Sequence, residues 1–217
     1  MLTPFQTRAM RSLGSAPFFG ELPPECVRWV YRTSVRRGET LFEKDAPSDR
    51  LHGLVGGLVK LCSQGAGGRA FSFGLVAPGE LVGELGMADG APRHASAVAL
   101  AHCELATIKR QDLEPLMERI PVLRTALAHA SAAAARRFSQ RLEESALLAI
   151  ETRVENALAD LARRLGQRVE RGIRIGLRQQ DLADLLGLSR ESVSRVLTSP
   201  AMRGRLELGR GSIVLVC

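Results

Sequence analysis

The sequence predicts an α+β protein with an N-terminal antiparallel β-roll of the jelly-roll type, a long helix in the middle, and a C-terminal winged helix-turn-helix. Three patterns along the 217 residues predict this fold. Short apolar runs alternate with Gly-rich turns in the first half, a stretch of helix formers follows, and two short helical segments joined at a glycine come last. The expected domain boundaries are 1–109, 110–149 and 150–217.

The β-roll is expected from Gly38 onward, after short helical pieces and turns that fill the chain up to about Arg37. Turns are predicted at the glycines of 56–57, 65–68, 79 and 83. The apolar runs that alternate with these turns are residues 40–42, 54–55, 58–61, 71–73, 81–82, 95–100 and 104–108. Many short strands joined by tight turns typically bury one face of each strand in a shared core.

The long helix is expected from Arg110 to about Ser145, with Pro115 and Pro121 as early interruptions. Its Ala-rich middle, ALAHASAAAARRF, leaves one face small enough for a second copy of the helix to approach closely, which predicts a homodimer. The alternative is that the helix only covers the sheet of its own subunit. The residues expected on or near the dimer seam are Leu127, Ala134, Phe138 and Leu142. A further amphipathic helix is predicted at 150–165, followed by a linker at 166–172.

The segment RQQDLADLLGLSRESVSRVL, residues 178–197, fits two helices that cross at a tight turn. Ala183 is small where the helices touch, and Gly187 stands where the turn needs a positive φ. Ser189 is a good N-cap for the second helix. The buried residues expected between the helices are Leu182, Leu186, Leu188, Val193 and Val196. This pattern predicts a helix-turn-helix.

The second helix carries side chains that suit the reading of base edges in the major groove of double-stranded DNA, because arginine can bind guanine bidentately and glutamate can accept from the cytosine amino group. The expected base readers are Arg190, Glu191, Ser194 and Arg195. Phosphate contacts are expected from Arg178, Gln179, Ser189, Arg203, Arg205 and Arg210, the last three flanking two wing strands at 206–208 and 213–216. The alternative is that these charges only solvate a surface helix, but the complete helix-turn-helix and its basic wing favour DNA.

The formal charge of +7 points to an anionic partner, nucleic acid before an acidic membrane surface. No run approaches the roughly 18 apolar residues of a membrane span, and the N-terminus lacks the layout of a secretion signal, so a cytoplasmic protein without a membrane partner is expected. The four cysteines contain no C-x-x-C pair and are expected to be reduced thiols without a metal. No His-x-His spacing, Ser-His-Asp elbow or phosphate loop occurs, so no enzyme is expected.

Three motifs together resemble the CRP/FNR family of bacterial regulators: GETLF at 38–42, APGELVGELGMADGAPRHASAVAL at 77–100, and SRESVSRVL at 189–197. The resemblance implies a homodimeric, sequence-specific transcription regulator that binds a palindromic operator. It further implies that the β-roll is a sensor domain controlled by a small effector, and that RNA polymerase is a partner if the regulator activates. The alternative is a cyclic-nucleotide-binding module that acts on a protein partner.

In cyclic-AMP-binding members of that family, a Gly-Glu-Leu turn and an Arg-Ser pair hold the ribose and the phosphate. The matching positions, which form the effector-binding set together with Ser139 of the long helix, are Gly83, Glu84, Leu85, Arg93 and His94, the last in place of the serine. By this resemblance Glu84 accepts from a ribose hydroxyl and Arg93 neutralises a phosphate. The two side chains can equally form a salt bridge that pins the turn of an empty roll.

The family's adenine-contacting Thr-Ser pair falls on Phe138 and Ser139 in one register of the long helix, and on Arg141 and Leu142 in the other. Neither register restores the pair, which argues against cyclic AMP and leaves another nucleotide, another small molecule or no ligand open.

The family's oxygen-sensing branch holds an iron–sulfur cluster on N-terminal cysteines, and a single Cys26 near the start argues against such a cluster here. Haem is disfavoured because a lone histidine is more often a surface or core side chain than a ligand; the histidines are His52, His94, His102 and His129. For DNA, Arg190, Glu191 and Arg195 match the CRP-type reader, while Glu191, Ser194 and Arg195 match the FNR-type reader. Half-sites resembling TGTGA and TTGA both remain open.

Overall fold

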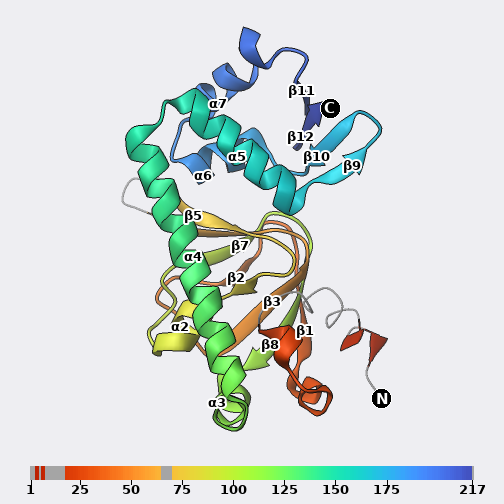
Figure 1. Cartoon of the computed structure of the whole chain (residues 1–217), viewed down its shortest axis with the longest axis vertical. Coiled ribbons are helices and arrows are strands. Elements are labelled where there is room, and N and C mark those ends of the chain that lie inside the picture. The colour runs from red at the N-terminus through yellow and green to blue at the C-terminus, as the bar shows by residue number, and fades with distance from the viewer. Residues whose placement is uncertain (1–2, 5, 8–17, 65–69, 217) are drawn as a thin grey trace. The chain divides into compact units, whose positions relative to one another are not determined.

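The computed structural model describes residues 3–4, 6–7, 18–64 and 70–216 (Figure 1). The chain divides into two compact units, one of residues Met1–Ser63 and Phe73–Arg137 and the other of Gln64–Ser72 and Phe138–Cys217. Each unit is described by itself. The glycine turn predicted at 65–68 lies outside the described residues.

The first unit is built on two four-stranded sheets whose strands pair antiparallel. One sheet has the order β1-β8-β3-β6, formed by Tyr31–Val35, Cys103–Lys109, Arg50–Gly56 and Leu81–Val82. The other has the order β2-β7-β4-β5, formed by Thr40–Phe42, Ser96–Ala99, Val59–Gln64 and Ala70–Val76, of which residues 64 and 70–72 are counted with the second unit. One apolar cluster joins residues of both sheets, among them Leu54, Val59, Ala97 and Leu105. The predicted β-roll is therefore confirmed.

A second cluster covers the outer face of the β1-β8-β3-β6 sheet. It packs Leu51, Val55 and Ile108 against Leu113 and Leu123 of the following helices. Along β3, Leu51 and Val55 belong to this cluster while Leu54 belongs to the cluster between the sheets. Both faces of the strand are buried, which explains why its sequence lacks the alternation typical of a half-exposed strand.

Two elements of this unit were not predicted. Strand β1 lies where the sequence indicates helical pieces and turns. It was not predicted because only Val35 of its five residues is buried, so its sequence does not show the alternation of apolar and polar residues that marks a strand. Helix α2, Glu84–Asp89, falls in the predicted strand-and-turn region, and it lies between Gly83 and Gly90, with φ of 86° and 78°. Two short 3₁₀ helices, Phe19–Glu21 and Pro24–Trp29, precede β1 and agree with the predicted short helical pieces.

The helical stretch predicted from Arg110 with interruptions at Pro115 and Pro121 is broken at Pro121, as predicted, but not at Pro115. The structure has two helices, α3 at Arg110–Arg119 and α4 at Pro121–Leu147. They are separated at Ile120, whose φ of −129° and ψ of 80° are not helical, because the ring of a following proline clashes with a helical residue before it. Pro115, by contrast, lies inside α3.

The predicted dimer seam is also partly wrong. Leu127 packs in the core of its own unit with Leu123 and Ala126, as the alternative of a helix covering its own sheet requires. Ala134 and Phe138 are half-buried, and Leu142 is exposed. The first turns of α4 therefore serve the core of the first unit, and the apolar residues left for another partner come later in the helix.

The second unit contains three helices and a four-stranded sheet of order β11-β12-β10-β9. The helices are α5 (Ile150–Leu165), α6 (Gln179–Leu186) and α7 (Arg190–Leu197), and a 3₁₀ turn, Pro200–Met202, follows them. The strands are β9 (Gln167–Val169), β10 (Gly172–Ile175), β11 (Leu206–Gly209) and β12 (Ser212–Val216). Helix α5 and the two wing strands confirm the prediction.

The linker predicted at 166–172 is wrong, because β9 and the turn into β10 occupy it. Strand β9 has three residues, none of them buried, and lies at the edge of the sheet. A strand this short and polar shows no alternation of apolar and polar residues from which it could be predicted. Among the described residues, no helix is both long enough and apolar enough to cross a membrane.

Candidate DNA-reading helix and effector loop

Helices α6 and α7 meet at the turn that the sequence predicts. Gly187 has a φ of 64°, in the left-handed region, and the Leu188 N–H donates to the Ala183 carbonyl at 3.0 Å. Leu182, Ala183 and Val193 are fully buried, so the small residue and the apolar residues lie between the helices as expected. The helix-turn-helix is confirmed, with Leu188 half-buried rather than buried.

Both helices begin with a side-chain hydrogen bond. At α7 the Ser189 hydroxyl accepts from the Ser192 N–H at 3.1 Å, which confirms the predicted N-cap. At α6 the carboxylate of Asp181 accepts from the Arg178 N–H at 3.3 Å. Asp181 is a residue that the sequence interpretation missed, although an acidic residue three positions after a helix start is a known signal.

Replacing Ser189 with alanine is expected to destabilise the second unit by about 0.5–2 kcal/mol, because the Ser192 N–H loses its acceptor. The measurement is the free energy of unfolding from urea denaturation followed by circular dichroism. Ser199→Ala is the matched control, since Ser199 precedes its 3₁₀ turn without a side-chain cap. Equal stability of the two variants would contradict the capping role.

The four predicted base readers share one side of α7. Arg190, Glu191 and Arg195 are exposed and Ser194 is half-buried, whereas Val193, Val196 and Leu197 on the other side are buried. Neither Arg190 nor Arg195 has a hydrogen bond or an ion pair within the described part of the chain. Hydrogen bonds from its own backbone N–H and from the Ser189 hydroxyl lower the pKa of Glu191 and keep it an ionised acceptor. The helix thus presents two free guanidinium groups and one carboxylate to solvent.

The predicted phosphate contacts lie at the helix starts and around the wing. Arg178, Ser189, Arg203, Arg205 and Arg210 are exposed, and Gln179 is half-buried. Arg205 is partly neutralised, since its Nη1 lies 3.6 Å from Oε1 of Glu155.

The sequence interpretation missed the arginines of the β9–β10 hairpin, because it took that hairpin for a linker. Arg168 and Arg174 are exposed on this hairpin, while Nη1 of Arg171 pairs with Glu207 at 3.3 Å.

Arg93 is the centre of the loop that corresponds to the predicted effector site. Its side chain is buried, with Nη1 donating to the Gly83 carbonyl at 3.0 Å and Nη2 to the Arg50 carbonyl at 2.5 Å. The guanidinium carbon lies 4.1 Å from the ring centroid of Phe42. A Cβ on Gly83 would come within 2.0 Å of Nη1, and its φ is 86°, so only glycine fits there.

Glu84 is buried beside this arginine but does not pair with it. No ion pair joins the two side chains among the residues that the structure describes, so the alternative of a pinning salt bridge is wrong. Glu84 Oε2 and Arg93 Nε are both buried without a hydrogen-bond partner, and burial raises the pKa of the carboxyl. Two unsatisfied polar atoms in one loop are costly unless a ligand completes them.

The remaining members of the predicted effector set are less enclosed. Leu85 is half-buried, and His94 is exposed with its ring edge-on to Phe73, the centroids 5.5 Å apart. Ser139 is exposed on α4 and belongs to the second unit. The structure therefore brings Gly83, Glu84 and Arg93 together.

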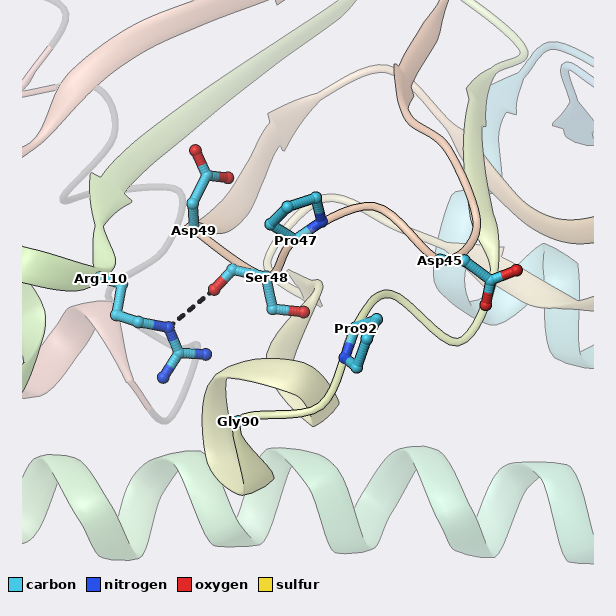
Figure 2. A pocket seen from close by; sticks show the side chains of 7 residues that line it. All are labelled: Asp45, Pro47, Ser48, Asp49, Gly90, Pro92 and Arg110. Atoms are coloured by element: carbon cyan, nitrogen blue, oxygen red, sulfur yellow. Dashed lines mark hydrogen bonds between the residues drawn. The ribbon is translucent and has the colours of Figure 1, made fainter.

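A hollow of about 410 Å³ lies beside this loop (Figure 2). Its lining residues are Asp45, Pro47, Ser48, Asp49, Gly90, Pro92 and Arg110. Arg110, the first residue of α3, donates from Nε to the Ser48 carbonyl at 2.8 Å and from Nη2 to the Gly86 carbonyl at 2.5 Å. It fastens α3 to α2 and so positions the effector loop. No sequence signal distinguishes this arginine from a surface charge.

Of the histidines and cysteines considered as ligands, His52 alone is a buried histidine, while Cys26, Cys62 and Cys103 are buried and form no disulfide within the described residues. Cys217 lies outside the described residues. His52 donates to or accepts from Thr107 Oγ1 through Nδ1 at 2.9 Å. Within the described ranges, no group of three or more His, Cys, Asp or Glu side chains is placed to hold a metal.

His52 is expected to make stability fall in mild acid. Burial lowers its pKa from 6.5 to about 3, so between these values the unfolded chain binds a proton that the folded chain does not. The contribution is therefore present above pH 6.5 and is lost by about 1.4 kcal/mol per pH unit as the pH falls below it. The measurement is the unfolding free energy from pH 7 to 4.5 for the wild type and for His52→Leu. A variant with the same pH slope as the wild type would contradict this prediction.

Each of the two units matches a known protein family. Residues 32–120 match the profile of the cyclic nucleotide-binding domain, and residues 152–216 match that of the Crp-like helix-turn-helix domain. The chain is 35% identical over 203 residues to the cyclic AMP receptor protein of Thermus thermophilus, with 92% of each chain covered. It is 29% identical over 181 residues to the CRP-like cAMP-activated global transcriptional regulator of Mycobacterium tuberculosis, covering 82% of this chain and 81% of that one.

Among solved structures, that of FixK2 from Bradyrhizobium japonicum matches with a TM-score of 0.75 at 25% identity, over 86% of this chain and 92% of that chain. The matches cover 92%, 81% and 92% of these three relatives' own lengths, so each spans both units of this chain. The chain belongs to the CRP/FNR family of DNA-binding transcription regulators.

Proposed function

We propose that the protein acts as a homodimer that lays two α7 helices, about 34 Å apart, into successive major grooves of a palindromic operator. The observation that carries this is the division of α7 into a buried apolar side and an exposed side with Arg190, Glu191 and Arg195. Since Arg190 and Arg195 have no hydrogen bond or ion pair to any described residue, no such contact has to break before DNA binds them.

The apolar residues exposed at the end of α4 and beyond support the dimer. Leu142 and Leu147 are exposed to 52% and 74%, and Leu148 and Ile150 follow them. Four exposed large apolar side chains within nine residues are costly in water and are typical of a surface that a second chain covers.

The test of DNA reading is selection from a random duplex library with the full-length protein, followed by titration of the selected sequence and a scrambled duplex of equal composition. A selected palindrome with TGTGA-like or TTGA-like half-sites, bound about 10³-fold or more tightly than the scrambled duplex, is the expected result. Equal affinity for both duplexes would overturn the proposal.

The proposed effector is a small molecule of nucleotide type, bound at the loop of Gly83, Glu84 and Arg93. The unsatisfied Glu84 Oε2 suits a ligand hydroxyl and the Arg93 guanidinium suits a phosphate, once Arg93 exchanges a carbonyl for it. His94 and the missing Thr-Ser pair of α4 distinguish this loop from that of cyclic-AMP binders. No catalytic step is proposed, and RNA polymerase is the further partner expected if the regulator activates.

The effector is tested by measuring operator affinity while cyclic AMP, cyclic GMP or other nucleotides are added to the intact dimer. A change in affinity that Arg93→Met removes supports the loop as the effector site. If no nucleotide changes the affinity for the operator, the effector is not a nucleotide. The proposal that the protein binds DNA would be unaffected by that result.

A further inference from the structure

A second hollow of the first unit, distinct from the effector loop, lies on the inner face of the β1-β8-β3-β6 sheet. It measures about 490 Å³ and is lined by Tyr31, Thr33, Leu41, Arg50, His52 and Lys109. Strand register places these residues together: His52 and Tyr31 both stand opposite Thr107, and Arg50 stands opposite Lys109. Leu54 and Leu105, which pack between the two sheets, lie on the same face. No residue of 83–94 lines this hollow.

A chain of three side chains connects two sides of the hollow. Thr33 Oγ1 and Thr107 Oγ1 are 2.7 Å apart, and Thr107 Oγ1 is 2.9 Å from His52 Nδ1. Thr107 is fully buried and His52 is 4% exposed. Nδ1 makes the sole hydrogen bond of His52 in the described part of the chain, which leaves Nε2 without a partner.

In this hydrogen-bonded series of side chains, one end donates a hydrogen bond when the other end accepts one. Burial lowers the pKa of His52 to about 3, so the ring is neutral and carries one N–H. If Nε2 bears the hydrogen, Thr107 donates to Nδ1, Thr33 donates to Thr107, and Thr33 is left to accept. If Nδ1 bears it, every bond reverses, so Nε2 accepts and Thr33 donates. A ligand hydroxyl, which both donates and accepts, satisfies either arrangement.

The charge at the opening favours an anion. Lys109 is exposed and has no ion pair among the described residues, whereas Nη2 of Arg50 lies 3.5 Å from Asp49 Oδ2. Asp49 does not line this hollow, and it offsets one of the two cations. One positive charge remains uncompensated, which suits a single carboxylate. Tyr31 and Leu41 add apolar wall for the body of a ligand.

We propose that this hollow binds a small hydroxylated carboxylate. Lys109, with Arg50, holds the carboxylate; Tyr31 and Leu41 contact the carbon skeleton; and the hydroxyl completes the His52–Thr107–Thr33 chain. The site is joined to the effector loop through Arg50, whose carbonyl accepts from Arg93. The proposal does not depend on the identity of the effector in that loop.

The test is isothermal titration calorimetry of the full-length protein with 4-hydroxybenzoate, benzoate and 4-hydroxybenzyl alcohol. We expect 4-hydroxybenzoate to bind once per chain, and the two analogues to bind about three- to tenfold more weakly, because benzoate lacks the ring hydroxyl and 4-hydroxybenzyl alcohol lacks the negative charge of the carboxylate. Lys109→Gln is expected to weaken both carboxylates and leave the alcohol unchanged. Thr33→Val is expected to weaken both hydroxyl compounds and leave benzoate unchanged.

Lys44→Gln, which removes an exposed charge that does not line the hollow, is the matched control and is expected to leave all three affinities unchanged. Absence of 4-hydroxybenzoate binding at about 10 mM, a concentration at which even a weak specific site of this size is largely filled, would overturn the proposal. Equal weakening by Lys44→Gln and Lys109→Gln would overturn it as well, since attraction would then follow net charge alone.

Discussion

Replacing Arg195 with alanine is expected to abolish the preference of the protein for its operator over random DNA. The side chain is exposed on α7 beside Glu191, on the side opposite the buried Val193 and Val196. A bidentate contact to guanine contributes about 1–3 kcal/mol of discrimination, and a dimer makes the contact in both half-sites. The two lost contacts together cost about 2–6 kcal/mol, so specific affinity should fall by a factor of roughly 30 to 10⁴, while affinity for random duplex changes little.

Arg210→Ala is the matched control for this prediction. Arg210 is exposed in the turn between β11 and β12, and it is the residue for which we expect a contact with phosphates rather than with bases. Its removal should weaken specific and random DNA alike and reduce the dependence of the logarithm of affinity on the logarithm of salt concentration by about one for each phosphate that is no longer neutralised. The two variants are compared by fluorescence anisotropy with operator and scrambled duplexes at several salt concentrations. The assignment of roles fails if both substitutions affect both duplexes equally.

Replacing Leu182 with alanine is expected to unfold the second unit while the first unit stays folded. Leu182 is fully buried in α6, next to the turn that holds α7. Removing a buried leucine side chain costs about 2–5 kcal/mol through lost transfer energy and the cavity left behind. A unit of about 90 residues has little more stability than that, so α7 should lose its support and operator binding should disappear.

The position of the aromatic residues allows the unfolding of the first unit to be followed separately. Trp29 and Tyr31, the sole tryptophan and tyrosine of the chain, both belong to the first unit. Thermal unfolding followed by tryptophan fluorescence should be unchanged in Leu182→Ala, while far-ultraviolet circular dichroism, which detects the helices of both units, should show an earlier transition. Gln180→Ala, at an exposed position of the same helix, is the control. Identical shifts in both signals would mean that the two units unfold as one.

Elements whose own residues carry a strong local signal could be predicted from the sequence. The helix-turn-helix depends on Ala183, Gly187 and Ser189. Each of these residues fixes the conformation or packing of its immediate neighbours in the sequence, so the motif can be predicted without knowing the rest of the fold. The buried strands likewise follow from apolar runs between glycines. In contrast, the edge strands β1 and β9 are held by partners distant in the sequence, and their residues show no period of their own.

The candidate effector site divides in the same way. Gly83, Glu84 and Arg93 were identified by their resemblance to a known motif, and the structure brings them into one loop. The hydrogen bonds of Arg93 to the Gly83 and Arg50 carbonyls, and those of Arg110 to Ser48 and Gly86, depend on tertiary contacts between segments far apart in the chain. Interruptions were predicted at both prolines of the long helical stretch, and only the one at Pro121 occurs, because Pro115, six residues earlier, is accommodated within α3.

The position of β12 bears on how the nascent protein folds on the ribosome. This strand is synthesised after the other three strands of its sheet, yet it lies between β11 and β10 and pairs with both. Until residues 212–216 emerge from the exit tunnel, β10 has an unpaired edge. The core of the unit also lacks the buried side chain of Ile213, which belongs to β12. Translation that stalls before Ser212 should therefore leave α6 and α7 without a finished support and expose a template for aggregation or a target for proteases.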